Sequence, residues 1–190
     1  MHGSVRKRRG RAGYYLAASL IALALIGLAV PSATARYRSA SHNTTSAARA
    51  YLMSGLGDAG AGAMDAMGAQ LRGRGTLVTV GSYTQEATFA ADACAHPADR
   101  IVIIGFSLGA TAGAELANAA RACGARPVRL VGIDPPGSSA SVVAGVSAVN
   151  FVGVLGGRIA GALNTPAPGF EHEALVNDPR MQARFLAAAR

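Results

Sequence analysis

The stretch IVIIGFSLGA, residues 101–110, decides the fold class of this 190-residue chain. Four β-branched residues lead directly into Gly105-Phe106-Ser107-Leu108-Gly109, and a run rich in small residues follows over 110–123. This order predicts a buried strand, a sharp turn and a helix, with Ser107 at the apex of the turn. The flanking glycines fit such a turn, because side chains there would collide with the neighbouring strand or helix. The pattern predicts a nucleophilic serine, and the alternative is a glycine-flanked turn without chemistry.

Apolar runs recur on both sides of this unit and alternate with helical patterns. Strands are predicted over 51–56, 76–80, 101–104, 128–133 and 146–154, and helices over 59–72, 85–95, 110–123 and 173–189. Alternation of this kind predicts βαβ units and a parallel sheet. The near-continuous apolar character of the strands indicates a sheet covered on both faces. We therefore predict an α/β fold, a three-layer sandwich with about five parallel strands.

The first 35 residues have the features of a secretory signal. A basic segment, 1–11, precedes the uncharged stretch 14–30, and the segment 31–35 ends in Ala-x-Ala. The apolar stretch has 17 residues, which is the lower end of the length that spans a bilayer. We predict cleavage after Ala35, with an uncleaved inner-membrane anchor as the alternative. The polar segment 36–50 is predicted to be a linker, and 51–190 one domain in the periplasm or outside the cell.

Charge and composition argue against several classes of function. The net charge is +8, but five of the 18 basic residues lie in 1–11, and the other 13 are scattered among 10 acids. A scattered excess is typical of a solvated surface rather than of a nucleic-acid site. No metal-ligand cluster is visible, and the serine turn lacks the lysine and the glycine spacing of nucleotide-binding loops. We predict no metal, no cofactor and no nucleic-acid partner.

Cys94 and Cys123 are the two cysteines of the chain. They lie late in the two predicted helices that flank the strand before Ser107. In an oxidising compartment they would form a disulfide, and the alternative is two buried thiols that never meet.

A serine nucleophile needs a base that removes its proton. His2 and His42 precede the predicted domain, and His96 lies at the amino end of the sheet. Ligands of parallel sheets bind beyond the carboxyl ends of the strands, so His172, which opens the last predicted helix, is the predicted base.

The base needs a carboxylate that fixes its tautomer. Asp134 closes the strand that follows the serine unit, at the carboxyl end, and is the predicted acid. Its alternative role is that of a turn residue before prolines, and Asp178, Glu171 and Glu173 are the alternative acids. The order Ser107, Asp134, His172 is the order of triads in α/β-hydrolases.

A tetrahedral intermediate needs two backbone donors. The amide of Leu108, at the start of the helix, is one predicted donor. The other is the amide of Leu56 in the glycine-rich loop after the first strand, with Gly55 as its alternative, although this loop also fits a plain glycine turn.

Three motifs resemble the α/β-hydrolase superfamily in its compact lipase, esterase and cutinase-like forms. They are Gly105 to Ala110, Gly132-Ile133-Asp134-Pro135 and Phe170-Glu171-His172. The resemblance covers most of 51–190 and implies that Ser107 forms an acyl-enzyme while His172 acts as base and then as acid. The sequence departs from the family in lacking the leading strands and the His-Gly oxyanion signature, in whose place stands the segment 54–57.

These observations predict a serine hydrolase of carboxylic esters or thioesters that acts on a small-molecule or lipid ester. Any membrane association would come from 14–30. The alternative is a catalytically inactive envelope binding protein on the same scaffold, because a fold does not guarantee its chemistry. The segment 155–169, rich in glycine and proline, is predicted to be either a mobile apolar flap over the site or an ordinary surface loop.

Overall fold

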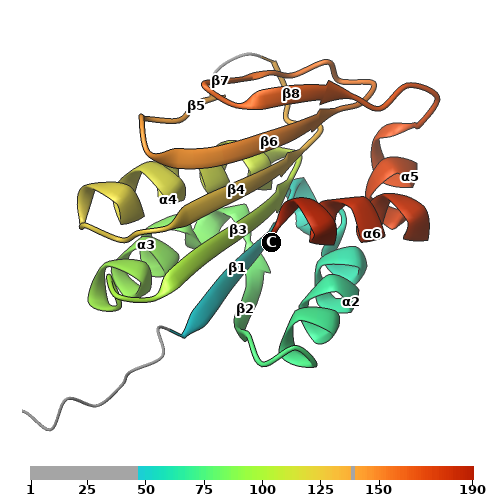
Figure 1. Cartoon of the computed structure of the whole chain (residues 1–190). Coiled ribbons are helices and arrows are strands. Elements are labelled where there is room, and N and C mark those ends of the chain that lie inside the picture. The colour runs from blue at the N-terminus through green and yellow to red at the C-terminus, as the bar shows by residue number, and fades with distance from the viewer. Residues whose placement is uncertain (1–46, 138–139) are drawn as a thin grey trace, which may run out of the picture. The chain divides into compact units, whose positions relative to one another are not determined.

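The computed structural model describes residues 47–137 and 140–190 (Figure 1). Residues 44–190 form one compact unit. The predicted signal segment, 1–35, and most of the predicted linker lie outside the described residues. Within the described part of the chain, no helix is long and apolar enough to cross a membrane.

The main sheet has six strands in the order β2-β1-β3-β4-β6-β8, and each neighbouring pair is parallel. The predicted three-layer α/β sandwich with a parallel sheet is therefore confirmed, with one strand more than the approximate number expected. The strands are β1 (Ala48–Ser54), β2 (Leu77–Ser82), β3 (Arg100–Phe106), β4 (Val128–Ile133), β6 (Val146–Val152) and β8 (Leu163–Pro166).

Helices cover both faces of the sheet because side chains alternate along each strand. Ala50 and Leu52 of β1 pack into a core with one group of helices, whereas Tyr51 and Met53 pack into a second core on the opposite face. Figure 1 shows the first group in front of the sheet and the second behind it. The first group is α2 (Ala61–Arg72), α5 (His172–Asn177) and α6 (Pro179–Ala188), and the second is α3 (Glu86–Ala95) and α4 (Leu108–Ala122).

Two element boundaries differ from the sequence prediction. β1 begins at Ala48, three residues before the predicted start and inside the segment predicted to be linker. The single helix predicted over 173–189 is two helices, because Asp178 begins a new one. Its carboxylate accepts hydrogen bonds from the amides of Arg180 (2.8 Å) and Met181 (3.1 Å), and Pro179 occupies the first turn.

The segment 155–169 contains two strands, so neither a mobile flap nor an ordinary loop describes its middle. β7 (Ile159–Ala160) pairs with β5 (Ala140–Ser141), and β8 extends the main sheet beside β6. Two buried or half-buried asparagines join these parts: Asn150 Nδ2 donates to Asn164 Oδ1 (2.8 Å), which also accepts from the amide of Ile159 (3.1 Å). The polar residues of β8 thus hold the segment in place, which is why an apolar pattern did not reveal the strand.

A disulfide joins Cys94, near the end of α3, to Cys123, just after α4, with the two Cα atoms 5.3 Å apart. It ties together the two helices on one face of the sheet. Disulfides persist in oxidising compartments, so this bond points to an extracytoplasmic location.

Removal of the disulfide in a Cys94→Ala/Cys123→Ala variant should lower the free energy of unfolding by about 3 kcal/mol, because the bond closes a loop of about 30 residues in the unfolded chain. Urea unfolding of the oxidised protein, the reduced protein and the variant measures this. Equal midpoints for all three would show that the bond contributes nothing to stability.

Candidate active site

The strand order places a topological switch between β1 and β3, since the chain leaves β1 toward β2 on one side and returns to β3 on the other. Ligands of open parallel sheets bind at such a point, beyond the carboxyl ends of the strands. The loop after β1, which contains the 3₁₀ turn η1 (Leu56–Asp58), and the turn after β3 meet there. They approach so closely that a Cβ added to Gly55 would lie 2.8 Å from Cβ of Ser107.

Ser107 lies in the sharp turn that the sequence predicted. Its backbone has φ 58° and ψ −125°, a strained conformation for a residue with a side chain. Both flanking glycines are required by close approach: a Cβ on Gly105 would overlap the carbonyl of Gly109, and a Cβ on Gly109 would overlap the carbonyl of Met53 in β1. The turn therefore presses the start of α4 directly against the backbone of β1.

His172 and Asp134 meet although they lie on different elements. Nδ1 of His172 donates to Oδ2 of Asp134 at 2.8 Å. The carboxylate is fully buried, and the amides of Gly153 (2.9 Å) and Leu155 (3.4 Å) also donate to it. An imidazole that donates through Nδ1 keeps Nε2 as its acceptor, which is the tautomer a general base needs.

The ring of Phe106 packs against one face of the His172 imidazole. The rings of Phe106 and His172 stack with centroids 4.4 Å apart and planes inclined by 28°. Phe106 itself is fully buried, and a Cβ on Gly60 would meet its ring at 2.6 Å. The residue that precedes the predicted nucleophile thus holds the predicted base on one face.

Ser107, the predicted nucleophile, and His172, the predicted base, are not hydrogen-bonded to each other in the described structure. Ser107 is 8% exposed, and no hydrogen bond joins its hydroxyl to His172 within residues 47–137 and 140–190. Such bonds are often long in ligand-free enzymes and shorten in the substrate complex. The two residues are linked indirectly, because Phe106, which precedes Ser107, stacks on the ring of His172.

The backbone donors can be distinguished by their hydrogen bonds. The amide of Gly55 donates to the carbonyl of Ala59 at 2.9 Å, so it is occupied. The amides of Leu56 and Leu108 have no acceptor in the part of the chain that the structure describes. This leaves the predicted pair, Leu56 and Leu108, available to an oxyanion.

None of the remaining described candidates is hydrogen-bonded to the imidazole of His172. Asp178 caps α6 and pairs with Arg180 (2.9 Å), whereas Glu171 and Glu173 are exposed and make no hydrogen bond to the imidazole. His96 follows the end of α3, where its Nδ1 lies 2.8 Å from the carbonyl of Asp92. His2 and His42 lie outside the described residues.

Two contacts of the candidate site do not follow from the sequence pattern. One is the stack of Phe106 on His172. The other is the approach of Gly153 to Asp134, where an added Cβ would lie 2.8 Å from Oδ2. A glycine at the end of the strand next to a carboxylate is the one sequence signal that could have revealed this approach.

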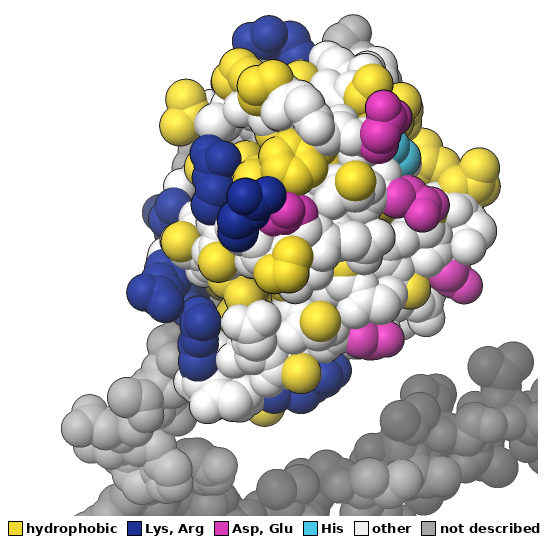
Figure 2. Space-filling view, turned by 90° about the vertical axis from the view of Figure 1, so that its right-hand side faces the viewer, with side chains coloured by type: hydrophobic (Ala, Val, Ile, Leu, Met, Phe, Trp, Pro, Cys, Tyr) yellow, Lys and Arg dark blue, Asp and Glu magenta, His cyan; other side chains and the backbone are white. Residues whose placement is uncertain are grey.

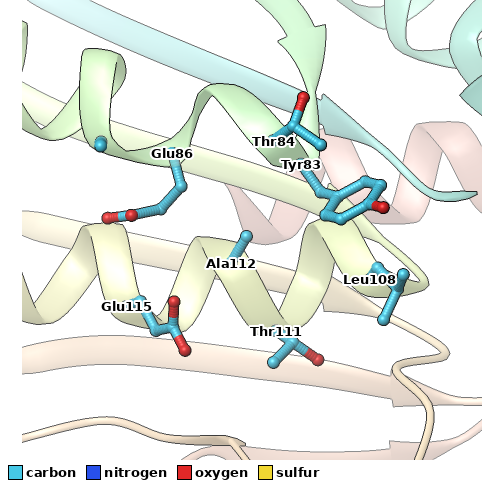
Figure 3. A pocket seen from close by; sticks show the side chains of 8 residues that line it. Tyr83, Thr84, Glu86, Leu108, Thr111, Ala112 and Glu115 are labelled. Carbon is cyan, nitrogen blue, oxygen red and sulfur yellow. The ribbon is translucent and has the colours of Figure 1, made fainter.

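A pocket of about 270 Å³ adjoins the site, between α4 and the segment formed by α3 and the 3₁₀ turn η2 (Tyr83–Gln85) (Figure 3). Leu108 lies at one end, and the carboxylates of Glu86 and Glu115 lie at the other. Burial, and the nearby charge of Glu115, raise the pKa of Glu86 above its ordinary value. The pocket is therefore lined by hydroxyl-bearing and aliphatic side chains toward Leu108 and by two carboxylates at its far end.

A second hollow, of about 320 Å³, lies beside the loop after β6 and the segment before α5. It is lined by Gly153, Val154, Phe170 and Glu171 among others, so it adjoins the Asp134–His172 pair rather than Ser107. Among the described residues, no group of three or more His, Cys, Asp or Glu side chains is placed to hold a metal ion.

Comparison with known proteins gives no family. No protein-family model matches the chain, and no curated protein matches it either. The chemistry of the site is therefore argued from its geometry.

Substitution of Gly109 by alanine should destabilise the protein by about 2 kcal/mol, because the added methyl overlaps backbone rather than a movable side chain. Gly62→Ala is the matched control: it lies in α2 with no atom within 4 Å of the added carbon, and should stabilise by up to about 1 kcal/mol. Thermal and urea unfolding measure both variants. A neutral Gly109→Ala would contradict the close approach of α4 to β1.

Glu86→Gln should increase stability at neutral pH but not at low pH. A carboxyl whose pKa is raised on folding binds more protons in the folded state, so stability falls as the pH rises from about 4.3, the ordinary glutamate value, through the raised value. The glutamine removes that fall, and Glu115→Gln should remove part of it. Melting temperatures measured from about pH 4 to pH 8 test this, with the exposed Glu173→Gln as the control. If the melting temperatures of Glu86→Gln and wild type change in parallel with pH, the prediction is contradicted.

Proposed function

We propose that this chain is a serine hydrolase with an α/β-hydrolase architecture, which cleaves carboxylic esters or thioesters. One observation carries the proposal: Nδ1 of His172 lies 2.8 Å from Asp134 while its ring stacks on Phe106, the residue before Ser107. The three residues come from loops at the carboxyl ends of β3 and β4 and from the start of α5. A buried carboxylate, an oriented imidazole and a strained serine are the parts of a triad.

In the proposed reaction, Oγ of Ser107 attacks the carbonyl carbon of the ester as Nε2 of His172 accepts the hydroxyl proton. The amides of Leu56 and Leu108 donate to the oxyanion that forms. His172 then gives its proton to the leaving alcohol or thiol, and an acyl-serine ester remains. Water, deprotonated by the same Nε2, attacks that ester and releases the acid, while Asp134 stabilises the imidazolium in both steps.

The pocket beside Leu108 suggests where part of the substrate binds. Its volume of about 270 Å³ lies just under the usual range for ligand pockets, about 300–1,000 Å³. Short acyl groups should therefore be favoured over long ones.

An inactive binding protein remains the second candidate, and the open contact between Ser107 and His172 is the observation that favours it. If the hydroxyl never reaches Nε2, the serine keeps its proton and is a poor nucleophile. The site would then bind an ester or acid without turning it over.

The proposed location is outside the cytoplasm, in the periplasm or medium. The signal-like segment 1–35 and the Cys94–Cys123 disulfide support it. An uncleaved segment 14–30 would instead anchor the enzyme in the inner membrane with this unit on the periplasmic side.

The protein from Arg36 onward should hydrolyse p-nitrophenyl esters, with higher kcat/KM for acetate and butyrate than for palmitate. Ser107→Ala should reduce kcat by about 10³-fold or more, and Asp134→Asn by at least about 10²-fold, because the amide no longer holds the tautomer. Circular dichroism checks that both variants are folded.

Labelling with a fluorophosphonate distinguishes the two candidates. Stoichiometric labelling of Ser107 supports the hydrolase. A folded protein that neither labels nor turns over any ester of the series would favour the binding protein, and turnover that survives in Ser107→Ala would overturn the assignment of the nucleophile.

A further inference from the structure

The arginines that are scattered in the sequence gather at one edge of the sheet. Residues 44–190 contain eleven arginines against ten acids, so this unit is nearly neutral as a whole. Besides the ion-paired Arg49 of β1, seven arginines lie at the amino ends of the strands, in the segments that lead into them or, for Arg190, in hydrogen-bond contact with Arg100. These seven, called here the basic edge, are Arg72, Arg74, Arg100, Arg121, Arg126, Arg129 and Arg190.

Topology explains the gathering. Arg72 and Arg74 precede β2, Arg100 opens β3, and Arg126 precedes β4. Parallel strands begin at one edge and lie about 4.8 Å apart, so the amino ends of β2, β1, β3 and β4 span about 15 Å. At the end of α6, Arg190 joins them, since its carbonyl accepts from Arg100 (3.1 Å).

The acidic side chains near the basic edge pair with Arg49 rather than with the seven arginines. The two acidic side chains near it, Asp92 and Asp99, both pair with Arg49 at 3.1 Å, and none of the seven arginines makes an ion pair with a described residue. Arg72, Arg74, Arg126 and Arg190 are exposed, and the other three are half-buried. Four guanidinium groups therefore face solvent on one side of the molecule.

The opposite edge is acidic. Asp58, Glu86, Asp134, Glu171 and Glu173 all lie after strands or at the starts of helices, at the carboxyl ends of the strands. Figure 2 looks onto this side and shows acidic side chains at its centre and right, and Lys and Arg side chains mainly over its left half. The molecule is thus polarised along its strands, with the candidate active site on the acidic edge.

Two exposed apolar side chains accompany the basic edge. Leu77, the first residue of β2, is 52% exposed, and Val143, three residues before β6, is 49% exposed. Arginines beside protruding aliphatic side chains are the composition of a surface that binds anionic lipid headgroups and inserts shallowly. Nucleic-acid sites stack bases on exposed aromatic rings. Among the described residues, the large hydrophobic side chains that are exposed are all Leu or Val.

We infer that the basic edge docks this unit on an anionic lipid surface. If the apolar stretch 14–30 stays uncleaved, it also places a membrane on this side, because the chain that follows it leads into β1, which begins at this same edge. Since β3 has seven residues, a strand length of about 23 Å separates the docked edge from Ser107. The docked protein therefore presents its site to the aqueous side, where it meets soluble substrates rather than the lipids beneath it.

Co-sedimentation of residues 44–190 with vesicles tests the inference, since this unit folds around its own cores and lacks the apolar stretch. Binding is expected to equimolar phosphatidylglycerol and phosphatidylcholine at about 0.01 M salt, and should weaken sharply above about 0.15 M as the screening length falls from about 30 to 8 Å. Pure phosphatidylcholine should not bind. Arg74→Gln/Arg126→Gln should weaken binding by about 25-fold, roughly fivefold for each arginine.

The matched control is Arg158→Gln/Arg180→Gln, which removes the same charge from two exposed arginines outside the basic edge. It should change binding less than about threefold, and thermal unfolding checks that both double variants are folded. Equal loss in the two variants, no binding at low salt, or a preference for single-stranded RNA over vesicles would each overturn the inference. Ser107→Ala should bind vesicles like wild type, so this test is independent of the proposed reaction.

Discussion

The structure depends on one contact, the approach of the turn at Ser107 to the backbone of β1. Gly109 meets the carbonyl of Met53 there, and Gly55 meets Ser107. This contact needs glycine on both partners, because backbone atoms cannot move aside as side chains do. It brings together the two loops at the switch point between β1 and β3, and these loops carry the amides of Leu56 and Leu108, which lack an acceptor among the described residues. Fold and site are therefore specified by the same few glycines.

The other half of the site is assembled by a second glycine-dependent approach, on the far side of β4. Gly153 admits the carboxylate of Asp134, whose oxygens then hold Nδ1 of His172. Phe106 links the halves, since it precedes Ser107 in the chain and stacks on the imidazole. The base is thus fixed relative to β3 and β4, the strands that carry the serine and the acid. In the proposed mechanism, the contact between Oγ of Ser107 and Nε2 of His172 is the one that forms when substrate binds.

The sequence predicted most strands and the common edge at which Ser107 and Asp134 lie, because these follow from apolar runs and from the rule that parallel strands end together. It missed what depends on partners distant in the chain. β8 is short and polar: it pairs with β6, and its Asn164 bonds to Asn150 and Ile159. The break before α6 needed the Asp178-Pro179 pair to be recognised as a cap. The stack of Phe106 on His172 joins residues 66 positions apart, which no local pattern reveals.

The same topology that gathers the site also separates charge. A parallel sheet collects every loop after a strand at one edge and every loop before a strand at the other, so residues far apart in sequence share an edge. The arginines seemed scattered because they were compared along the chain, yet Arg74, Arg100 and Arg126 all precede or open strands. A nearly neutral unit can thus carry one basic and one acidic end. The electrostatic asymmetry is then a property of the fold and its loops, as the candidate site is. The basic edge lies at the amino ends of the strands, and the candidate site lies at their carboxyl ends.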